Sequence, residues 1–185
     1  MRIPIVMLAG VLLVSACSSK GAAPHPSRQS ESTRSVEDIE AGAPVTTVSA
    51  AATGERHGSR IADLRLAHHA GFDRLVVEFT RNVPDVWAEF EDEPYQDECP
   101  YKRPAGAVFL NLTMHGASTL DPYAEQPFYE GPSRVRAETT NMTEAVLACD
   151  THGVVSMVVG VRLRQPMRVH ELANPPRLVI DVEAP

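Results

Sequence analysis

Apolar and polar residues alternate with a period of two through most of the chain after residue 59. In the segment 75–79 (LVVEF), Leu75, Val77 and Phe79 fall on one face of a strand, and Val76 and Glu78 fall on the other. Turn-forming Gly, Pro, Asn and Asp residues separate such segments. The pattern predicts nine strands, at residues 60–66, 75–79, 85–90, 107–114, 134–139, 143–149, 154–163, 167–172 and 177–182. With no convincing amphipathic helix, this series predicts an antiparallel β-sandwich or barrel over residues 59–185.

The first residues of the chain have the pattern of an export signal. Ile3–Ala16 is an apolar run of 14 residues that follows Arg2, and it is too short to span a bilayer. It ends in LVSAC, residues 13–17, which resembles the lipobox of bacterial lipoproteins. That resemblance implies a lipoprotein signal peptide at 1–16, cleavage before Cys17 and acylation of the Cys17 thiol. We expect the lipid to hold the protein on the extracytoplasmic face of the cell membrane. A plain secretory signal with a cysteine there by chance is the alternative.

Residues 17–58 carry this lipidation site and then a linker. The segment after Cys17 is rich in Ser, Ala, Pro, Gly and Thr, and it has no aromatic residue and no sustained period. Such a composition buries too little apolar surface to offset the entropy of ordering, so we predict a disordered linker. About 40 flexible residues have a typical end-to-end distance of roughly 35 Å, which places the domain above the membrane.

The charge balance and the absence of known motifs argue against nucleic-acid binding and against an enzyme. There are 17 Lys and Arg against 24 Asp and Glu, a net charge of −7, and no basic cluster, which argues against nucleic acid as a partner. The seven His residues form no HExxH motif, and GxSxG and phosphate-loop motifs are absent from the sequence, so we predict no catalytic residue, cofactor or metal site. The acidic run at 89–98 lacks the spacing of a calcium loop and is interpreted as a solvated loop. A metal-dependent or His/carboxylate hydrolase is the alternative, and it requires His115 or His152 to meet an Asp or Glu in a pocket.

Cys99 and Cys149 remain once Cys17 is assigned to the lipid. A pair of cysteines in an exported protein is most simply a disulfide, so we predict that they are joined. Two separate thiols, one in a loop and one in a strand, are the alternative.

Two segments about a hundred residues apart are similar to each other. FDRLVVEF at 72–79 and PPRLVIDV at 175–182 each contain an Arg, three aliphatic residues, an acid and an apolar residue. One copy on each side of a sandwich would explain the similarity. This signature at both ends of an all-β domain, together with YEGP at 129–132 and VVGV at 158–161, resembles the AMIN and AMIN-like domains of bacterial envelope proteins.

The AMIN-like version is found mainly in actinobacterial lipoproteins and secreted proteins. The resemblance implies a non-catalytic antiparallel β-sandwich of about eight to nine strands. It also implies a partner in the cell envelope, either peptidoglycan or another envelope protein. Its motifs are mostly strand cores, so they are more specific for the fold than for the function.

Two groups of side chains are candidates for binding such a partner. Arg74 and Arg177 begin the two similar segments, and a guanidinium matches the carboxylates of peptidoglycan stem peptides. Cross-strand salt bridges are the alternative role for these arginines. Tyr123, Phe128 and Tyr129 lie in one long loop and would stack on sugars if they were exposed together, whereas packing of that loop onto the sandwich edge is the alternative.

Overall fold

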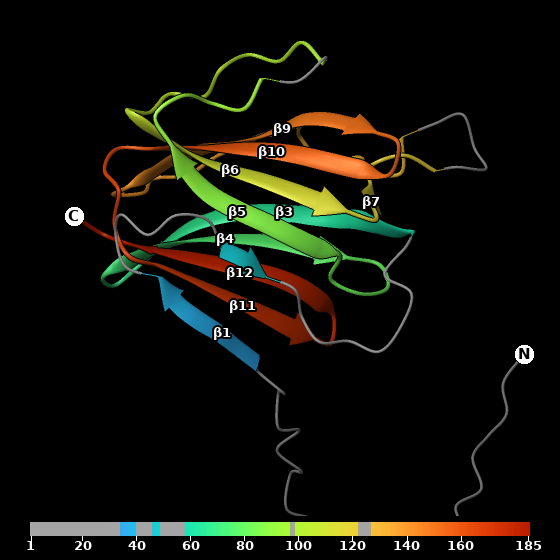
Figure 1. The fold of residues 1–185 in the computed structure, drawn as a ribbon, viewed down its shortest axis with the longest axis horizontal. Coiled ribbons are helices and arrows are strands. Elements are labelled where there is room, and N and C mark those ends of the chain that lie inside the picture. Colours follow the sequence, from blue (N-terminus) through green and yellow to red (C-terminus); the bar gives the residue numbers. More distant parts are fainter. Residues whose placement is uncertain (1–33, 40–45, 49–57, 97–98, 122–126) are drawn as a thin grey trace, which may run out of the picture. The chain divides into compact units, whose positions relative to one another are not determined.

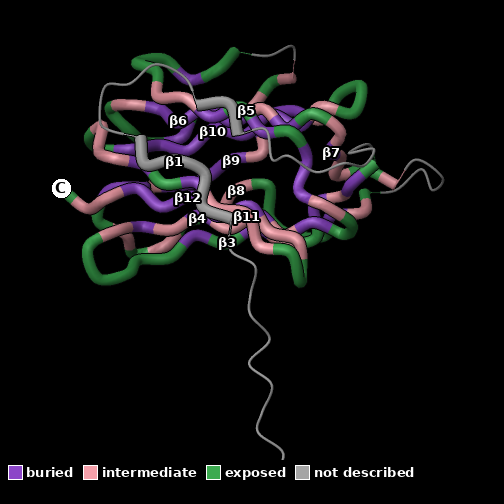
Figure 2. Tube along the Cα trace, turned by 60° about the horizontal axis from the view of Figure 1, so that its bottom comes forward, coloured by how far each residue is buried: buried purple, intermediate pink, exposed green. Residues whose placement is uncertain are grey.

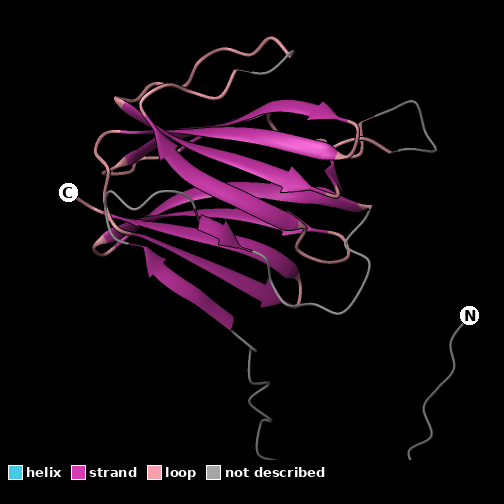
Figure 3. Ribbon diagram, in the orientation of Figure 1, coloured by secondary structure: helices cyan, strands magenta, loops and turns pink. Residues whose placement is uncertain are grey.

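The computed structural model describes residues 34–39, 46–48, 58–96, 99–121 and 127–185. These residues form strands and loops without a helix, as Figure 3 shows, so no helix among them is long and apolar enough to cross a membrane. Figure 1 shows two sheets stacked face to face, with strand orders β1-β11-β12-β4-β3-β7 and β2-β5-β6-β10-β9-β8. The strands are β1 (Arg34–Ile39), β2 (Thr46–Val48), β3 (Ser59–His69), β4 (Phe72–Phe79), β5 (Asp85–Glu91), β6 (Val108–His115), β7 (Ala117–Ser118), β8 (Arg134–Arg136), β9 (Met142–Thr151), β10 (Val154–Val161), β11 (Met167–Ala173) and β12 (Pro176–Glu183). The chain is therefore an all-β sandwich, as the alternating pattern predicts.

Each of the nine predicted strands corresponds to one observed strand, and three observed strands were not predicted. The two-residue β7 is too short to show a period. β1 and β2 lie within residues 17–58, the predicted linker, and pair with β11 and β5 at the edges of the two sheets. The linker prediction therefore needs correction at these nine residues. An edge strand can be held by backbone hydrogen bonds alone, so it needs no apolar alternation. The predicted signal peptide at 1–16, Cys17 and the rest of the linker up to residue 57 lie outside the described residues.

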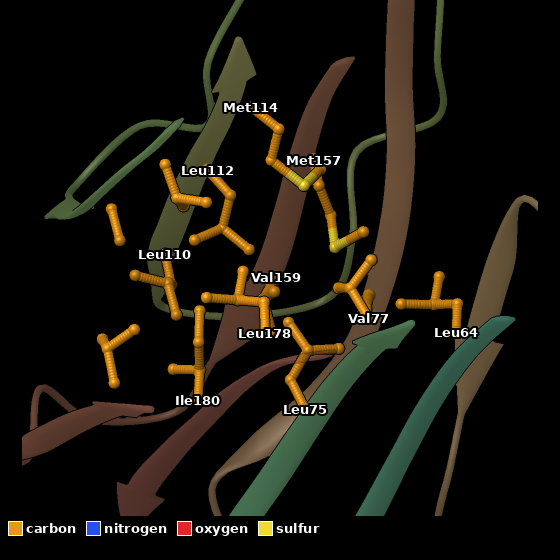
Figure 4. Packing of buried hydrophobic residues seen from close by; sticks show 14 of the residues in the cluster. Leu64, Leu75, Val77, Leu110, Leu112, Met114, Met157, Val159, Leu178 and Ile180 are labelled. Carbon is orange, nitrogen blue, oxygen red and sulfur yellow. The ribbon is translucent and has the colours of Figure 1, made fainter. Parts of the chain in front are cut away.

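The main core lies between the inner faces of the two sheets. Leu75 and Ile180 are opposite each other in the first sheet, and Leu110 and Val159 are opposite each other in the second. All four are fully buried, and Figure 4 shows the two pairs facing each other across the core. In Figure 2 the buried positions follow the strands and the exposed ones follow the loops. Burying one such side chain stabilises the fold by about 1.5–3 kcal/mol relative to leaving it exposed.

The two similar segments form β4 and β12, which are antiparallel neighbours in the same sheet. The expectation of one copy on each side of the sandwich is therefore wrong. Antiparallel pairing places the Arg of each copy opposite the acid of the other copy: Arg74 is opposite Asp181, and Arg177 is opposite Glu78. The shared pattern thus makes the two strands complementary to each other.

A second, smaller apolar cluster lies on the outer face of the second sheet, under the loop 92–107. Phe109, Ala148 and Val158 are buried there, with Tyr101 of the loop packed against them. The guanidinium of Arg103 lies 4.4 Å from the centre of the Phe109 ring. A side chain at Gly160 would bring its Cβ within 1.9 Å of the backbone oxygen of Ala105, so this loop can lie so close to β10 only because residue 160 is a glycine. The loop is thus a packed part of the domain.

Candidate functional site

An open groove of about 670 Å³ lies at the end of the sandwich where β3 begins and β6 ends. Four segments that are far apart in the sequence contribute its walls: the start of β3, the loop after β4, the chain from the end of β6 to the loop after β7, and the turn between β9 and β10. Its lining residues are Gly58, Arg60, Arg81, His115–Ser118, Leu120, Asp121, Asp150 and His152–Val154. The volume is within the range of sites that hold small molecules or part of a polymer.

Two glycines are among the residues that line this groove. Gly116 and Gly153 have φ values of +86° and +76°, a left-handed conformation that glycine adopts without steric cost. The N–H of Gly116 donates a hydrogen bond to the carbonyl of Gly153 at 2.7 Å. This bond joins the turn after β6 to the turn after β9, so backbone holds two of the lining segments together.

Asp150 and Arg60 hold one wall of the groove. Oδ2 of Asp150 accepts hydrogen bonds from the Ser118 hydroxyl at 3.0 Å and from the N–H and hydroxyl of Thr119 at 2.5 and 2.6 Å. Arg60 forms an ion pair with Asp121 at 3.2 Å, and its guanidinium lies 4.7 Å from the centre of the Phe128 ring. These contacts hold the wall in place, and they give the carboxylates of Asp121 and Asp150 partners within the protein.

Three other polar side chains of the groove are exposed and available. Arg81, His115 and His152 are exposed, and within the described part of the chain their side chains have no hydrogen-bond or ion-pair partner. A guanidinium and two imidazoles thus surround the opening as potential donors. In the described ranges, no three His, Cys, Asp or Glu side chains are grouped so that they could hold a metal ion.

The hydrolase alternative requires His115 or His152 to meet an Asp or Glu in a pocket, and the groove tests this requirement. His115 and His152 do share a pocket with Asp121 and Asp150. However, Asp121 is paired with Arg60, and Oδ2 of Asp150 already accepts three hydrogen bonds. An oriented His and carboxylate pair, as general base catalysis requires, is not formed among these described residues.

The two arginines predicted as binding residues lie on the outer face of the first sheet, away from this groove. Arg74 forms a bidentate ion pair with Asp181, with distances of 2.6 Å from Nε to Oδ1 and 2.7 Å from Nη2 to Oδ2. The hydrogen bond to Asp181 raises the pKa of Arg74. Nε of Arg177 donates to the carbonyl of Pro175 at 3.3 Å. The pairing register separates the two arginines by four residues, roughly 13 Å along the strands, so they do not act as one pair.

The three aromatic residues predicted as a sugar-stacking group do not form such a surface among the residues that the structure describes. Tyr123 lies outside those residues. Phe128 is half-buried beneath Arg60, whereas Tyr129 is only 9% exposed and packs in the main core. The Tyr129 hydroxyl donates to the carbonyl of Pro132 at 3.2 Å, and burial together with the charge of Asp63 raises its pKa. The segment 127–129 is therefore packed against the sandwich.

Two other aromatic side chains are exposed, and the sequence analysis did not single them out. Trp87 is 42% exposed on β5, and Tyr95 is 44% exposed in the following loop. A signal for Trp87 is present in the sequence, because the alternation in 85–90 places it on the polar face with Asp85 and Glu89. No such signal exists for Tyr95, since it lies in a loop without a period.

The predicted disulfide between Cys99 and Cys149 is confirmed. Their Cα atoms are 5.3 Å apart, and the bond links the loop 92–107 to β9 across 50 residues of sequence. The loop is further held by Glu144 of β9, which accepts a hydrogen bond from the N–H of Ala105 at 2.6 Å. The Tyr95 end and the Ala105 end of the loop are thus both attached to the sheet.

Comparison with known proteins identifies the domain. The family model of the AMIN-like domain matches residues 59–184, which is about two thirds of the chain and spans β3 to β12. No curated protein and no solved structure matches the chain. The resemblance inferred from the two similar segments is therefore confirmed for the domain, and the chain belongs to the AMIN-like domain family.

Proposed function

We propose that the protein is a lipid-anchored envelope protein whose AMIN-like domain binds peptidoglycan, without catalysis, through the groove at the end of the sandwich. AMIN-like domains are generally linked to binding of peptidoglycan or of other envelope components. The observation that carries the proposal is the groove itself, whose lining includes the exposed side chains of Arg81, His115 and His152.

The chemistry of the groove matches that of the polymer. Peptidoglycan combines amino sugars, which are neutral, with short peptides that carry carboxylates. The Arg81 guanidinium would donate two parallel hydrogen bonds to a carboxylate, a geometry that arginine provides and lysine does not. Leu120, which is 48% exposed, adds an apolar contact in the same wall. An envelope protein with an acidic segment is the other partner that this chemistry admits.

Lipidation of Cys17 is the second part of the proposal. The sequence LVSAC at 13–17 supports it, and a chain with a net charge of −7 gains no attraction to an anionic lipid surface from its charge. Membrane attachment would then depend on the acyl chains, each methylene of which contributes roughly 0.8 kcal/mol. The domain would act on the extracytoplasmic side, within reach of the wall.

Sedimentation with purified, insoluble peptidoglycan tests the proposal. Residues 18–185 are expected to bind in a saturable manner, and Arg81→Ala is expected to weaken binding about tenfold because a charged hydrogen-bond pair is lost. Lys102→Ala is the matched control, since it removes the same charge from an exposed position outside the groove. We expect it to bind like the wild type.

Two outcomes would contradict the proposal. If binding does not exceed that of a neutral control protein, peptidoglycan is not the ligand and an envelope protein becomes the partner to seek. If soluble muropeptides are released during the incubation and Asp150→Asn abolishes the release, the His and carboxylate groups of the groove form an active site.

A further inference from the structure

Trp87 and Tyr95 are the exposed aromatic side chains among the large apolar residues that the described ranges leave accessible to solvent. Leu120 and Leu163 are the other two exposed residues of this kind. An aromatic ring of this size is usually buried because it carries 150–250 Å² of surface. Trp87 on β5 and Tyr95 in the loop that follows are therefore candidates for contact with a partner.

The two rings belong to the same face of the second sheet. The N–H of Tyr95 donates a hydrogen bond to Oδ1 of Asn111 at 2.9 Å, so this part of the loop lies directly over β6. Asn111 is opposite Glu89 of β5, and Trp87 is two residues before Glu89 with its side chain on the same face. Two residues correspond to about 7 Å along a strand, so Trp87 lies about that far along the sheet from the level at which the Tyr95 backbone is bonded to Asn111.

The position of Tyr95 is fixed by the loop around it. The Tyr101 hydroxyl donates a hydrogen bond to the carbonyl of Tyr95, and the Cys99–Cys149 disulfide attaches the same loop to β9. Trp87 lies on a strand that is paired with β6 on one side and with β2 on the other. Both rings are therefore carried by backbone that is already ordered, which reduces the entropy lost on binding.

The charged side chains on β5 beside Trp87 indicate which charge a ligand can carry. Asp85, Glu89 and Glu91 point to the same face of β5 as Trp87, so three carboxylates lie along its strand. Arg103, which lies over Phe109 opposite Glu91, is paired with Glu93. Carboxylates accept hydrogen bonds from hydroxyl and amide groups, and they repel polymers rich in phosphate. A neutral chain that carries hydroxyls and amides is therefore favoured over an anionic one.

We propose that Trp87 and Tyr95 form a platform on which the neutral amino sugars of a glycan strand stack. His115, a lining residue of the groove, is on β6 two residues from Thr113, and Thr113 is opposite Trp87. The platform therefore continues into the groove on one side of the sheet. This inference rests on the proposed function in taking wall polymer as the ligand, and it assigns the glycan to the platform and the peptide to the groove.

The chain contains a single tryptophan, so its fluorescence reports on Trp87 alone. Residues 18–185 are titrated with a soluble tetramer of N-acetylglucosamine, which has the glycan chemistry and lacks the peptide. We expect a saturable change in tryptophan emission and saturable heat in calorimetry. Trp87→Ala and Tyr95→Ala, followed by calorimetry, are each expected to weaken binding about fivefold or more. Leu163→Ala, which also truncates an exposed apolar residue (52% exposed), is the control and should bind like the wild type.

Arg81→Ala separates this inference from the proposed function. It is expected to bind the tetramer like the wild type while its binding to whole peptidoglycan is weakened. If the tetramer produces neither an emission change nor heat at millimolar concentration, the platform is overturned, and sedimentation that depends on Arg81 still supports the groove. Equal binding by Trp87→Ala and the wild type, with unfolding temperatures that show both to be folded, also overturns it.

Discussion

Asp73 is a buried carboxylate on β4 that joins the two sheets. Its oxygens accept hydrogen bonds from the N–H groups of Thr140 at 3.2 Å, Asn141, and Met142 at 2.8 Å, at the start of β9 in the opposite sheet. Nδ1 of His68 lies 2.8 Å from the same carboxylate. Burial by itself would raise the pKa of Asp73, but these hydrogen bonds outweigh burial and lower it.

Replacing Asp73 is expected to weaken the sandwich more than replacing a surface acid. Asp73→Asn keeps the shape but loses the charge and one acceptor oxygen, which leaves a backbone N–H unsatisfied in the interior. We expect the free energy of unfolding at pH 7 to fall by about 3 kcal/mol, measured by urea denaturation. Asp92→Asn, whose carboxylate is 88% exposed and pairs with Arg164, should cost less than about 1 kcal/mol. Equal losses in the two variants would refute the role given to Asp73.

Glu144 makes the stability of the domain depend on pH. Burial would raise its pKa, but the hydrogen bonds from Arg134, Ala105 and Arg136 outweigh burial and lower it to about 2. The unfolded chain, in which this pKa is ordinary, therefore binds the proton first as the pH falls. The stabilisation from Glu144 is complete above about pH 5 and is lost as the pH falls toward 2.

This difference in pKa corresponds to about 3 kcal/mol of unfolding free energy. In Glu144→Gln we expect a lower stability at pH 7 and a smaller further loss between pH 5 and pH 2.5 than in the wild type. Urea denaturation at several pH values measures both quantities. A variant that loses stability with pH as steeply as the wild type would assign the pH dependence to other carboxylates.

Among the strands, those with a sustained apolar pattern could be predicted, and β1, β2 and β7 could not. Alternation in segments such as 75–79 reports directly on burial, because Leu75, Val77 and Phe79 are all buried in the core. β1, β2 and β7 are added at sheet edges through backbone pairing, which leaves no mark in the hydrophobic pattern. The similarity of β4 and β12 was recognised in the sequence, but their adjacency depends on a pairing register that residues a hundred positions apart do not reveal.

The loop 92–107 is the element that depends most on a covalent bond. It covers Phe109 and Val158, and the Cys99–Cys149 disulfide closes 50 residues of chain. In the double variant Cys99→Ser, Cys149→Ser we expect the free energy of unfolding to fall by about 4 kcal/mol, because the unfolded chain gains the entropy of the open loop.

Hydrogen exchange distinguishes a local effect from a general one in that double variant. Amides of the loop 92–107 should exchange faster than in the wild type by a larger factor than the amides of β4 and β12, which lie in the other sheet. A uniform acceleration over both sheets would mean that the disulfide acts only through the unfolded state and does not hold the loop.

At the scale of the whole molecule, the candidate site could not be located from the sequence. Arg74 and Tyr129, two of the residues predicted to bind a wall polymer, form a salt bridge and pack in the core. The groove is assembled from four separate segments, so no local motif marks it. His115 and His152 were noted in the sequence, and only the fold brings them into one groove.

Attachment to the membrane is a property of the whole chain and is tested in the producing cell. If Cys17 is lipidated, the full chain is expected in the membrane fraction, and Cys17→Ser is expected in the soluble extracytoplasmic fraction, because its acyl chains are missing. Incorporation of a labelled fatty acid into the wild type and not into Cys17→Ser provides the direct measurement. Retention of Cys17→Ser in the membrane fraction would require a different anchor.

The order in which the chain is made bears on when this domain can fold. β12 is the last strand of the sequence, yet it lies between β11 and β4 in the interior of the first sheet, with Leu178 and Ile180 fully buried. Until residues 176–183 are present, β4 lacks one of its two neighbours, and β11 has no strand to join it to the rest of the sheet. If the chain is exported N-terminus first, as proposed above, it completes its first sheet only after residues 176–183 have crossed the membrane.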